Sequence, residues 1–459
     1  LPLVIEAAEG LFTKAQYKAL RDALGYEAWK VVRRHVQSVL VLVAAGGECI
    51  DDLDTLRADP GLSALLGFGL SSPTQVKDFL YRFHQAEDGR LLSKQDDAEL
   101  TVVGKAQIRA EGPGLRALGQ MGQAVVERLQ ARSCQERATL DVDATIIEAH
   151  KRQSLVAYEG TRGYQPQMAW WAEHQLWVCD EFRDGNVPAA FAVLDFLKKA
   201  YGRLPSTVKE RRLRADSALY DEDALTWAGD VAGIEFAVSA YMSEELVGAA
   251  KALPEESWKP YRALRENEKV GVATEEREWA EVEFVPNWKR NRKKEGTAFR
   301  YVAIRVRFCQ RDLLVPDEGR WRHFAVVTNM DWEGERLLRW HREKQGTVEH
   351  GHGVLKNELA GGTLPCGKFG ANAAWWRLNV LAQGVLQFLK VEALPASMQA
   401  LRPKALRFRL FNVAGRLVHH SRQIWLYVSE KLPTAKVYAQ ARTALLGLAS
   451  GPPTPVPTT

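Results

Sequence analysis

The sequence has 459 residues, which is longer than one ordinary domain, so two to four structural units are expected. Hydrophobic residues make up 46% and charged residues 26%, a balance typical of a soluble globular protein with a real core. The 62 Lys and Arg exceed the 57 Asp and Glu by a formal charge of +5. This excess is too small to indicate a nucleic-acid partner by itself, and its distribution matters more.

The five cysteines include no CxxC pair, and their odd number and wide spacing argue against a disulfide framework and against a zinc cage; they are Cys49, Cys134, Cys179, Cys309 and Cys366. Such cysteines suit a reducing cytoplasm. The longest apolar run near the start, residues 39–45, is too short to span a bilayer and lacks the layout of a secretory signal, so no membrane partner is expected. Because the sequence starts with Leu1 rather than Met, we expect a few native residues before it.

Residues 1–135 are predicted to be helical. Ser72 and Pro73 form a strong helix start, since Ser caps the first turn and Pro fits its first position. Apolar residues at helical spacing then define two buried helix faces, Val76-Phe79-Leu80-Phe83 and Leu115-Leu118-Met121-Val125. We interpret this region as a DNA-binding module, although helical N-terminal segments of this kind also serve purely structural roles.

Residues 136–239 change to strand-like patterns and predict the first part of a mixed α/β sheet domain. The strands are expected at residues 138–147, 168–172, 175–182, 211–216 and 234–239, with helices at 188–201 and 222–229. Residues 240–323 predict a β-rich insertion, with strands at 278–285 and 299–308. The remaining regions are the second part of the core at 324–392, a C-terminal helical region at 393–450 and a disordered Pro/Thr-rich tail at 451–459.

Three acidic positions carry the chemistry. Asp141 and Asp143 lie two apart in a predicted strand, so both project from one face, where carboxylates repel unless they are solvated, protonated or bound to a cation. Asp216 ends a later strand, and Glu349 lies on a helix that also carries Lys356 two turns on. Each position has an ordinary alternative, namely a solvated edge strand, a helix cap and an exposed helix site.

Taken together and in this order, two strand carboxylates and one helix carboxylate can hold two Mg²⁺ ions, with Mn²⁺ as a substitute, because hard cations prefer oxygen ligands. Such a pair activates water or a 3′-hydroxyl and stabilises the leaving oxygen during in-line attack at a DNA phosphate. The sequence therefore predicts metal-dependent phosphoryl transfer by Asp143, Asp216 and Glu349.

Long strings around these acids resemble the DDE transposases of bacterial insertion sequences, of the type with a group-1 DDE domain. The matching strings are Asp143-Ala144-Thr145 with Ala149-His150, Arg214-Ala215-Asp216-Ser217, and residues 324–329, 344–349, 355–359, 369–375 and 406–410. The resemblance covers nearly the whole chain. It implies a ribonuclease-H-like mixed-sheet core with Asp143, Asp216 and Glu349 as catalytic triad and metal ligands. It also accounts for the long interval before Glu349, because related cut-and-paste transposases carry a β-rich insertion there.

The chain departs from this family in one place. Relatives often have Tyr and Arg seven and four positions before the catalytic Glu, where this chain has Arg342 and Gln345. The Lys seven positions after the Glu is kept as Lys356. We therefore expect Arg342 or Lys344 to contact DNA phosphates, together with Lys356.

A basic run in the insertion is a second expected DNA contact. Residues 288–294 combine one aromatic with five cations, and those assigned to DNA are Trp288, Lys289, Arg290, Arg292 and Lys293. A solvated loop is the ordinary alternative for such a run. A Trp of the insertion is expected to receive a flipped base, and the candidates are Trp258, Trp279, Trp288 and Trp321. The C-terminal region adds a basic face suited to DNA or to a partner subunit: Arg402, Lys404, Arg407, Arg409, Arg416 and Arg422.

The resemblance implies an enzyme that binds the terminal inverted repeats of its element, hydrolyses DNA strands and joins the freed 3′ ends to target DNA. A homodimer is expected on the DNA, because two transposon ends are handled together. We expect the protein in the bacterial cytoplasm, at the nucleoid when bound to DNA. The alternatives are a transposase derivative that binds DNA without cutting it, and a different ribonuclease-H-like nuclease such as a junction resolvase.

Overall fold

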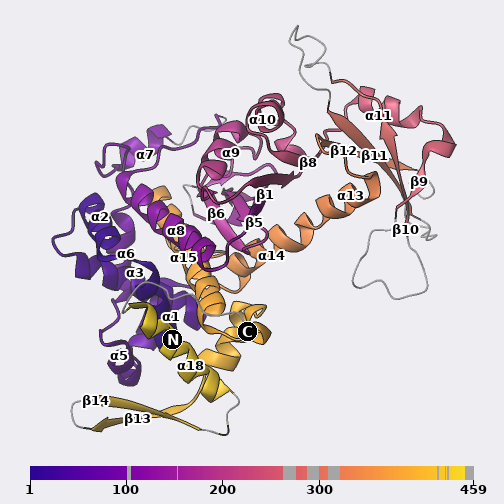
Figure 1. The fold of residues 1–459 in the computed structure, drawn as a ribbon. Coiled ribbons are helices and arrows are strands. Elements are labelled where there is room, and N and C mark those ends of the chain that lie inside the picture. Colours follow the sequence, from indigo (N-terminus) through magenta and orange to yellow (C-terminus); the bar gives the residue numbers. More distant parts are fainter. Residues whose placement is uncertain are drawn as a thin grey trace.

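The structure is a computed structural model that describes residues 1–100, 105–151, 154–261, 275–286, 299–308, 321–420, 423–429, 431 and 434–449. A helical body lies beside a large β-sheet, and the sheet extends away from the body into an arm at the upper right of Figure 1. The N-terminal region is helical, as predicted, and consists of α1 (Pro2–Leu11), α2 (Lys14–Leu24), α3 (Trp29–Ala45), α4 (Leu53–Arg57), α5 (Pro60–Leu66), α6 (Pro73–Tyr81), α7 (Lys94–Leu100) and α8 (Pro113–Arg132).

The helix start at Ser72 shows how local sequence sets these elements. The Ser72 hydroxyl accepts a hydrogen bond from the backbone N–H of Gln75, and the Gln75 side chain accepts one from the N–H of Ser72. This reciprocal capping satisfies two N–H groups that have no partner inside the helix. The predicted start of α6 is thereby confirmed, and its apolar face is buried at Val76, Phe79 and Leu80.

The central sheet has nine strands in the order β6-β5-β1-β7-β8-β12-β11-β10-β9. Its first five strands by position are β6 (Leu176–Glu181), β5 (Gln167–Trp171), β1 (Arg137–Ala144), β7 (Glu210–Ala215) and β8 (Glu235–Ser239). β5 runs antiparallel to β1 and β6, whereas β7 runs parallel to β1 and to β8. This order and these directions are those of a ribonuclease-H-like core, which confirms the predicted fold class.

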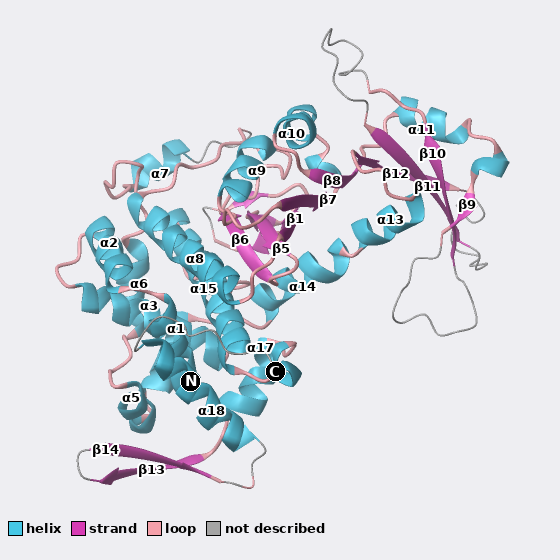
Figure 2. Ribbon diagram, viewed as in Figure 1, coloured by secondary structure: helices cyan, strands magenta, loops and turns pink. Residues whose placement is uncertain are grey.

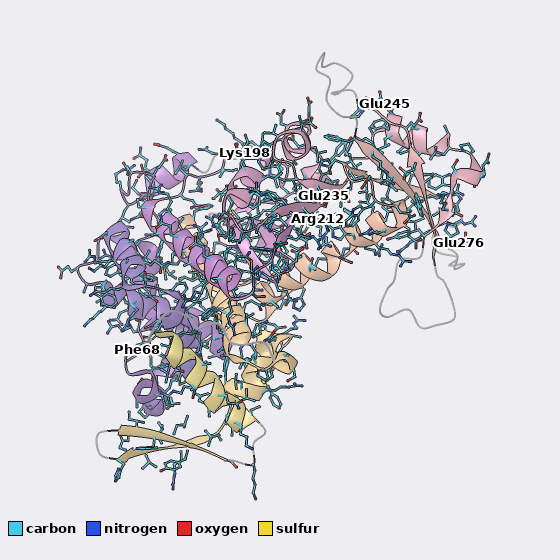
Figure 3. The ribbon with its side chains drawn as sticks, viewed as in Figure 1. Phe68, Lys198, Arg212, Glu235, Glu245 and Glu276 are labelled. Carbon is cyan, nitrogen blue, oxygen red and sulfur yellow. The ribbon has the colours of Figure 1, made fainter. Side chains whose placement is uncertain are left out.

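Because β1, β7 and β8 are parallel, their amino ends lie along one side of the sheet and their carboxyl ends along the other. Helices α9 (Val193–Gly202) and α10 (Glu222–Thr226) make the crossovers to β7 and β8. Arg212 of β7 and Glu235 of β8 lie side by side toward the start of their strands, with 2.7 Å between Arg212 Nε and Glu235 Oε2 (Figure 3). The carboxyl ends of β1 and β7 therefore lie next to each other at the other end of these strands. A small three-stranded sheet, β2 (Ile147–Glu148), β4 (Arg162–Tyr164) and β3 (Leu155–Val156), follows β1 there.

The strands described within residues 240–323 continue the core sheet instead of forming a sheet of their own. β12 (Arg322–Thr328) pairs antiparallel with β8, and β11 (Arg300–Phe308), β10 (Glu275–Val282) and β9 (Lys259–Pro260) follow outward. Helix α11 (Glu244–Lys251) lies beside this extension (Figure 2). The described strands of the arm thus belong to the same sheet as the strands that carry Asp143 and Asp216.

Two consecutive helices, α13 (Gly334–Arg342) and α14 (Lys344–Asn357), run as a rod from the arm to the core (Figure 1). α13 packs Leu337 and Leu338 on the extended sheet, in a cluster with Trp279 and Val326. α14 crosses β1 and β5. It approaches closely at Gly351, where a Cβ would stand 2.8 Å from Trp177 and 3.0 Å from Trp170.

Helix α15 (Phe369–Ala393) is buried along most of its length and joins the helical body to the sheet. Its Arg377 is 3% exposed and donates hydrogen bonds to Asp180 of β6 and to Glu111, which precedes α8. Both carboxylates raise the pKa of Arg377 against the opposing effect of burial. A buried cation with two anionic partners fixes three segments in one geometry.

The C-terminal region was expected to be helical, and this prediction is wrong for its middle part. Helices α16 (Ala396–Gln399), α17 (Pro403–Leu406) and α18 (Thr434–Ala449) are present, but β13 (Gly415–His420) and β14 (Gln423–Val428) form a two-stranded hairpin between them. The segment is rich in β-branched and aromatic residues, which favour strands. The expected tail at 451–459 lies outside the described residues. None of the helices in the described part combines the length and apolar character needed to cross a bilayer.

Two glycines of α14 provide a matched test of its packing. We expect Gly351→Ala to lower the free energy of unfolding by about 1–3 kcal/mol, because the new methyl group overlaps Trp170 and Trp177. A Cβ on Gly353 would instead point into open space, with no neighbouring atom within 4 Å, so Gly353→Ala should raise the free energy of unfolding by about 0.5–1 kcal/mol through helix propensity. Urea unfolding of both variants measures this, and equal effects would contradict the packing argument.

Candidate active site

Asp143 and Asp216 leave the sheet side by side. Asp143 is the penultimate residue of β1, and Asp216 follows directly after β7. The two strands are parallel neighbours in which Val142 pairs with Ala215, so Asp143 and Asp216 occupy the next step of the same register. Strand direction and register therefore bring together two acids that are far apart in the sequence.

Glu349 reaches the same place from α14. Asp143, Asp216 and Glu349 all line one pocket of about 770 Å³. Its walls come from both the core and the arm, and four cations line it with the three acids: Arg277 of β10, Arg322 of β12, Arg342 of α13 and Lys344 of α14. Two aromatic side chains on the wall are well exposed, Tyr241 at 67% and Phe324 at 49%.

Asp143 lies in a strongly perturbed environment. Burial, together with the negative charge of Asp216, raises the pKa of its carboxyl from the ordinary 3.8 to about 6, against the opposing effect of Lys344. The Lys344 ammonium lies 3.4 Å from Asp143 Oδ1, and Nε2 of the buried His352 lies 3.7 Å from Oδ2. Neither ring nitrogen of His352 has a hydrogen-bond partner in the described chain.

Asp141 has a different role from Asp143, although both project from one face of β1. It is fully buried, and Arg214 of β7 donates to both of its oxygens at 2.6 and 2.9 Å. The Thr347 hydroxyl of α14 also donates to Asp141. Arg214 in turn donates to the Trp340 carbonyl and to Glu343 at the junction of α13 and α14. Asp141 is therefore a structural anchor, which the sequence did not distinguish from Asp143.

Asp216 caps the turn after its strand and also lines the pocket. One of its oxygens accepts a hydrogen bond from the backbone N–H of Ala218 at 3.0 Å, which caps the short turn after β7, while the side chain also lines the pocket. Next to it, the ring of His341 on α13 donates through Nε2 to the Ala215 carbonyl at 3.0 Å. Burial lowers the pKa of His341 to about 4, so the ring is neutral near pH 7.

The residues assigned to DNA are only partly within the described chain. Arg342 and Lys344 line the pocket, whereas the half-buried Lys356 donates to the Ile146 carbonyl at 3.4 Å. Trp288, Lys289, Arg290, Arg292 and Lys293 lie outside the described residues, so that prediction stays a prediction.

The other tryptophans considered for a flipped base differ in exposure. Trp258 and Trp279 are 8% and 4% exposed and pack inside the arm, which leaves no face for a base. Trp321 is half-buried, with the guanidinium groups of Arg305 and Arg307 over its ring at 4.4 and 4.6 Å. The exposed aromatics of the pocket, Tyr241 and Phe324, were not anticipated from the sequence.

The donor set of the pocket suits divalent ions, because carboxylate oxygens are the ligands that Mg²⁺ and Mn²⁺ prefer. The Lys344 ammonium beside Asp143 shows that the site accommodates positive charge. Within the described chain, however, no three carboxylate, imidazole or thiolate groups lie close enough to share one ion. The three acids therefore share a pocket, while Glu349 is exposed and stands apart from the Asp143–Asp216 pair.

The buried ion pair of Asp141 and Arg214 generates a stability prediction. Arg214→Met leaves the Asp141 carboxylate buried without its cation, and we expect a loss of about 3–5 kcal/mol in the free energy of unfolding. Asp141→Leu in the same chain removes that unpaired charge and should restore most of the loss. Chemical denaturation of the single and double variants measures the coupling energy between Asp141 and Arg214. If the losses of the two single variants add up in the double variant, the two residues are not coupled.

The perturbed carboxyl of Asp143 generates a pH prediction. Because its pKa is raised in the folded protein, ionisation of Asp143 lowers the stability of the fold as pH rises from 3.8 to about 6, and the penalty is complete above that. Without divalent ions, Asp143→Asn should therefore stabilise the protein by about 1–3 kcal/mol near pH 7.5. The gain should shrink at about pH 5. Thermal unfolding at the two pH values measures it, and a pH-independent difference would contradict the assignment.

Comparisons with known proteins place this geometry in a family. The sequence profile described as transposase DDE domain group 1 matches residues 23–450. No curated protein shows significant similarity to the chain. Among solved structures, the fold is similar to that of piggyBac transposase in a synaptic complex with hairpin DNA, with a TM-score of 0.50, 9% identity, and coverage of 88% of this chain and 78% of that chain. The chain therefore belongs to the DDE transposases, which are metal-dependent enzymes that cut DNA and transfer its strands.

Proposed function

We propose that this chain is the transposase of a bacterial insertion sequence. It binds the terminal inverted repeats of its element, hydrolyses DNA strands there and joins the 3′ ends to target DNA. The observation that carries the proposal is the convergence of Asp143, Asp216 and Glu349 on one pocket, from two adjacent strand ends and a helix. The family match over most of the chain supports it.

In this proposal, Asp143, Asp216 and Glu349 are the catalytic residues and hold two Mg²⁺ ions, for which Mn²⁺ can substitute. When bound, the ions activate the attacking hydroxyl and stabilise the leaving oxygen of the phosphodiester. Asp143 and Asp216 lie near each other, whereas the exposed Glu349 stands apart in the same pocket, so its side chain would have to move toward the pair to share an ion with them. The Lys344 ammonium, which stands 3.4 Å from Asp143 Oδ1, would be available to a DNA phosphate if cations occupied the carboxylates.

The remaining pocket residues bind and orient the DNA strand. Arg342 and Lys344 take the place of the Tyr and Arg that relatives carry before the Glu, and Arg277 and Arg322 face them from the arm. Guanidinium groups suit phosphate oxygens because they donate two parallel hydrogen bonds. The exposed rings of Tyr241 and Phe324 provide faces on which an unpaired base can stack next to the cut.

Two transposon ends have to be cut and joined together, so we propose that the active form on DNA is a homodimer. The chain acts on chromosomal DNA in the bacterial cytoplasm. The basic residues 288–294 add phosphate contacts in this proposal, as their composition indicates.

The test is a set of isosteric substitutions. Asp143→Asn, Asp216→Asn and Glu349→Gln should each lower Mg²⁺-dependent cleavage of the element's ends by roughly 10³-fold or more, because each removes a carboxylate ligand. Binding of the same DNA in the presence of EDTA should change little. Asp195→Asn, on the exposed surface of α9, is the matched control and should cleave normally.

Full cleavage by any of the three variants would refute the triad. Binding of end DNA without any cleavage in Mg²⁺ or Mn²⁺ would favour a DNA-binding derivative. Preferential cutting of branched DNA would instead favour a junction-resolving nuclease.

A further inference from the structure

The β13–β14 hairpin has one anchored face and one exposed face. Leu417 pairs with Leu426 on the first face, and Leu417 Cδ1 lies 2.9 Å from the position of a Cβ on Gly61 of α5. The pairs Arg416–Tyr427 and Val418–Trp425 alternate with these residues and so point to the other side. Trp425 and Tyr427 are 50% and 54% exposed there.

The second face of the hairpin is suited to an interaction partner. Large exposed aromatic rings on a regular surface mark an interaction site. The Arg416 guanidinium lies 5.6 Å from the centre of the Tyr427 ring, so cation and aromatic form one continuous surface. We call Arg416, Trp425 and Tyr427 the hairpin face.

The charge around the hairpin face indicates the kind of partner. Residues 393–429 contain Lys and Arg at six positions and no Asp or Glu, although the two charge types are nearly equal in number over the whole chain. Lys404, Arg409 and Arg416 are exposed, as is Phe408 at 81%. Exposed cations interleaved with aromatic rings, without acids among them, complement a polyanion that also presents flat bases.

We propose that the hairpin face binds double-stranded DNA as a β-ribbon, at a point remote from the cleavage pocket. This inference rests on the proposed function for the identity of its ligand. A two-stranded ribbon fits the major groove of duplex DNA. The hairpin lies at the lower left of Figure 1, at the end of the molecule opposite the arm. One duplex held in the pocket and on the hairpin face is therefore gripped at two separate stretches.

The test compares duplex binding by two doubly substituted proteins. Arg416→Ala with Trp425→Ala should weaken binding of a fluorescent mixed-sequence duplex of roughly 40 base pairs by about 10-fold in EDTA, and should lower the slope of log Kd against log salt by about one. Lys198→Ala with Val231→Ala is the matched control, since it also removes an exposed cation and an exposed apolar side chain, and its affinity should stay within about 2-fold. Arg416→Lys should keep most of the affinity, and circular dichroism checks that every variant is folded.

Equal duplex binding by the hairpin variant and the unmodified chain would overturn the inference. So would a change in oligomeric state, measured by light scattering, with DNA affinity unaltered, because the hairpin face would then be a subunit interface. Because the binding assay is run in EDTA, its result does not depend on whether the chain cleaves DNA. Failure of the proposed function would appear as duplex binding without cleavage, and failure of this inference as cleavage and binding that do not depend on Arg416 and Trp425.

Discussion

The ion pair between Asp141 and Arg214 is the contact on which the geometry of the active site depends. Both side chains are almost fully buried, and they are direct neighbours on parallel strands β1 and β7. Through its remaining nitrogen, Nη1, Arg214 also donates to the Trp340 carbonyl and to Glu343, where α13 passes into α14. A single guanidinium thus sets the position of the two strand ends relative to the helix that carries Glu349. Burial makes this arrangement costly to break, because each charge would be left without its partner.

The two acids of β1 have different surroundings. Asp141 has its own cation and accepts three hydrogen bonds, and it does not line the pocket. Asp143, two residues along the same face, is buried next to Asp216 with a single ammonium at 3.4 Å, and burial and the negative charge of Asp216 raise its pKa. Positive charge placed next to such a carboxyl stabilises its ionised form. The ionised carboxylates of Asp143 and Asp216 therefore destabilise each other at the strand ends, and bound divalent cations would reduce this repulsion.

The parts of the structure that depend on short-range pattern could be predicted from the sequence. The core strands follow from runs of β-branched residues, and α6 follows from its capping residues. The acids at 143, 216 and 349 line one pocket, while their assignment as shared metal ligands stays a prediction. The role of Asp141 was not predictable, because it depends on the register between β1 and β7 and on where α14 crosses them. The continuation of the core sheet into the insertion likewise depends on pairing between β8 and β12, which are distant in the sequence. The hairpin at 415–428 was missed because strong helices on both sides dominated the pattern.

The continuity of the sheet has a consequence for how DNA meets the acids. Arg277 and Arg322 are held on β10 and β12, and these strands join the core through β8, next to the strand that ends at Asp216. Arg342 and Lys344 belong to the helical rod that crosses the same sheet and carries Glu349. Cations from the arm and carboxylates from the core are thus fixed to one another by backbone hydrogen bonds and by packing around Trp279 and Leu337. Under the proposed function, a phosphate bound by the arm cations would be positioned relative to the acids by this continuous sheet, and such positioning is what phosphoryl transfer requires of a protein.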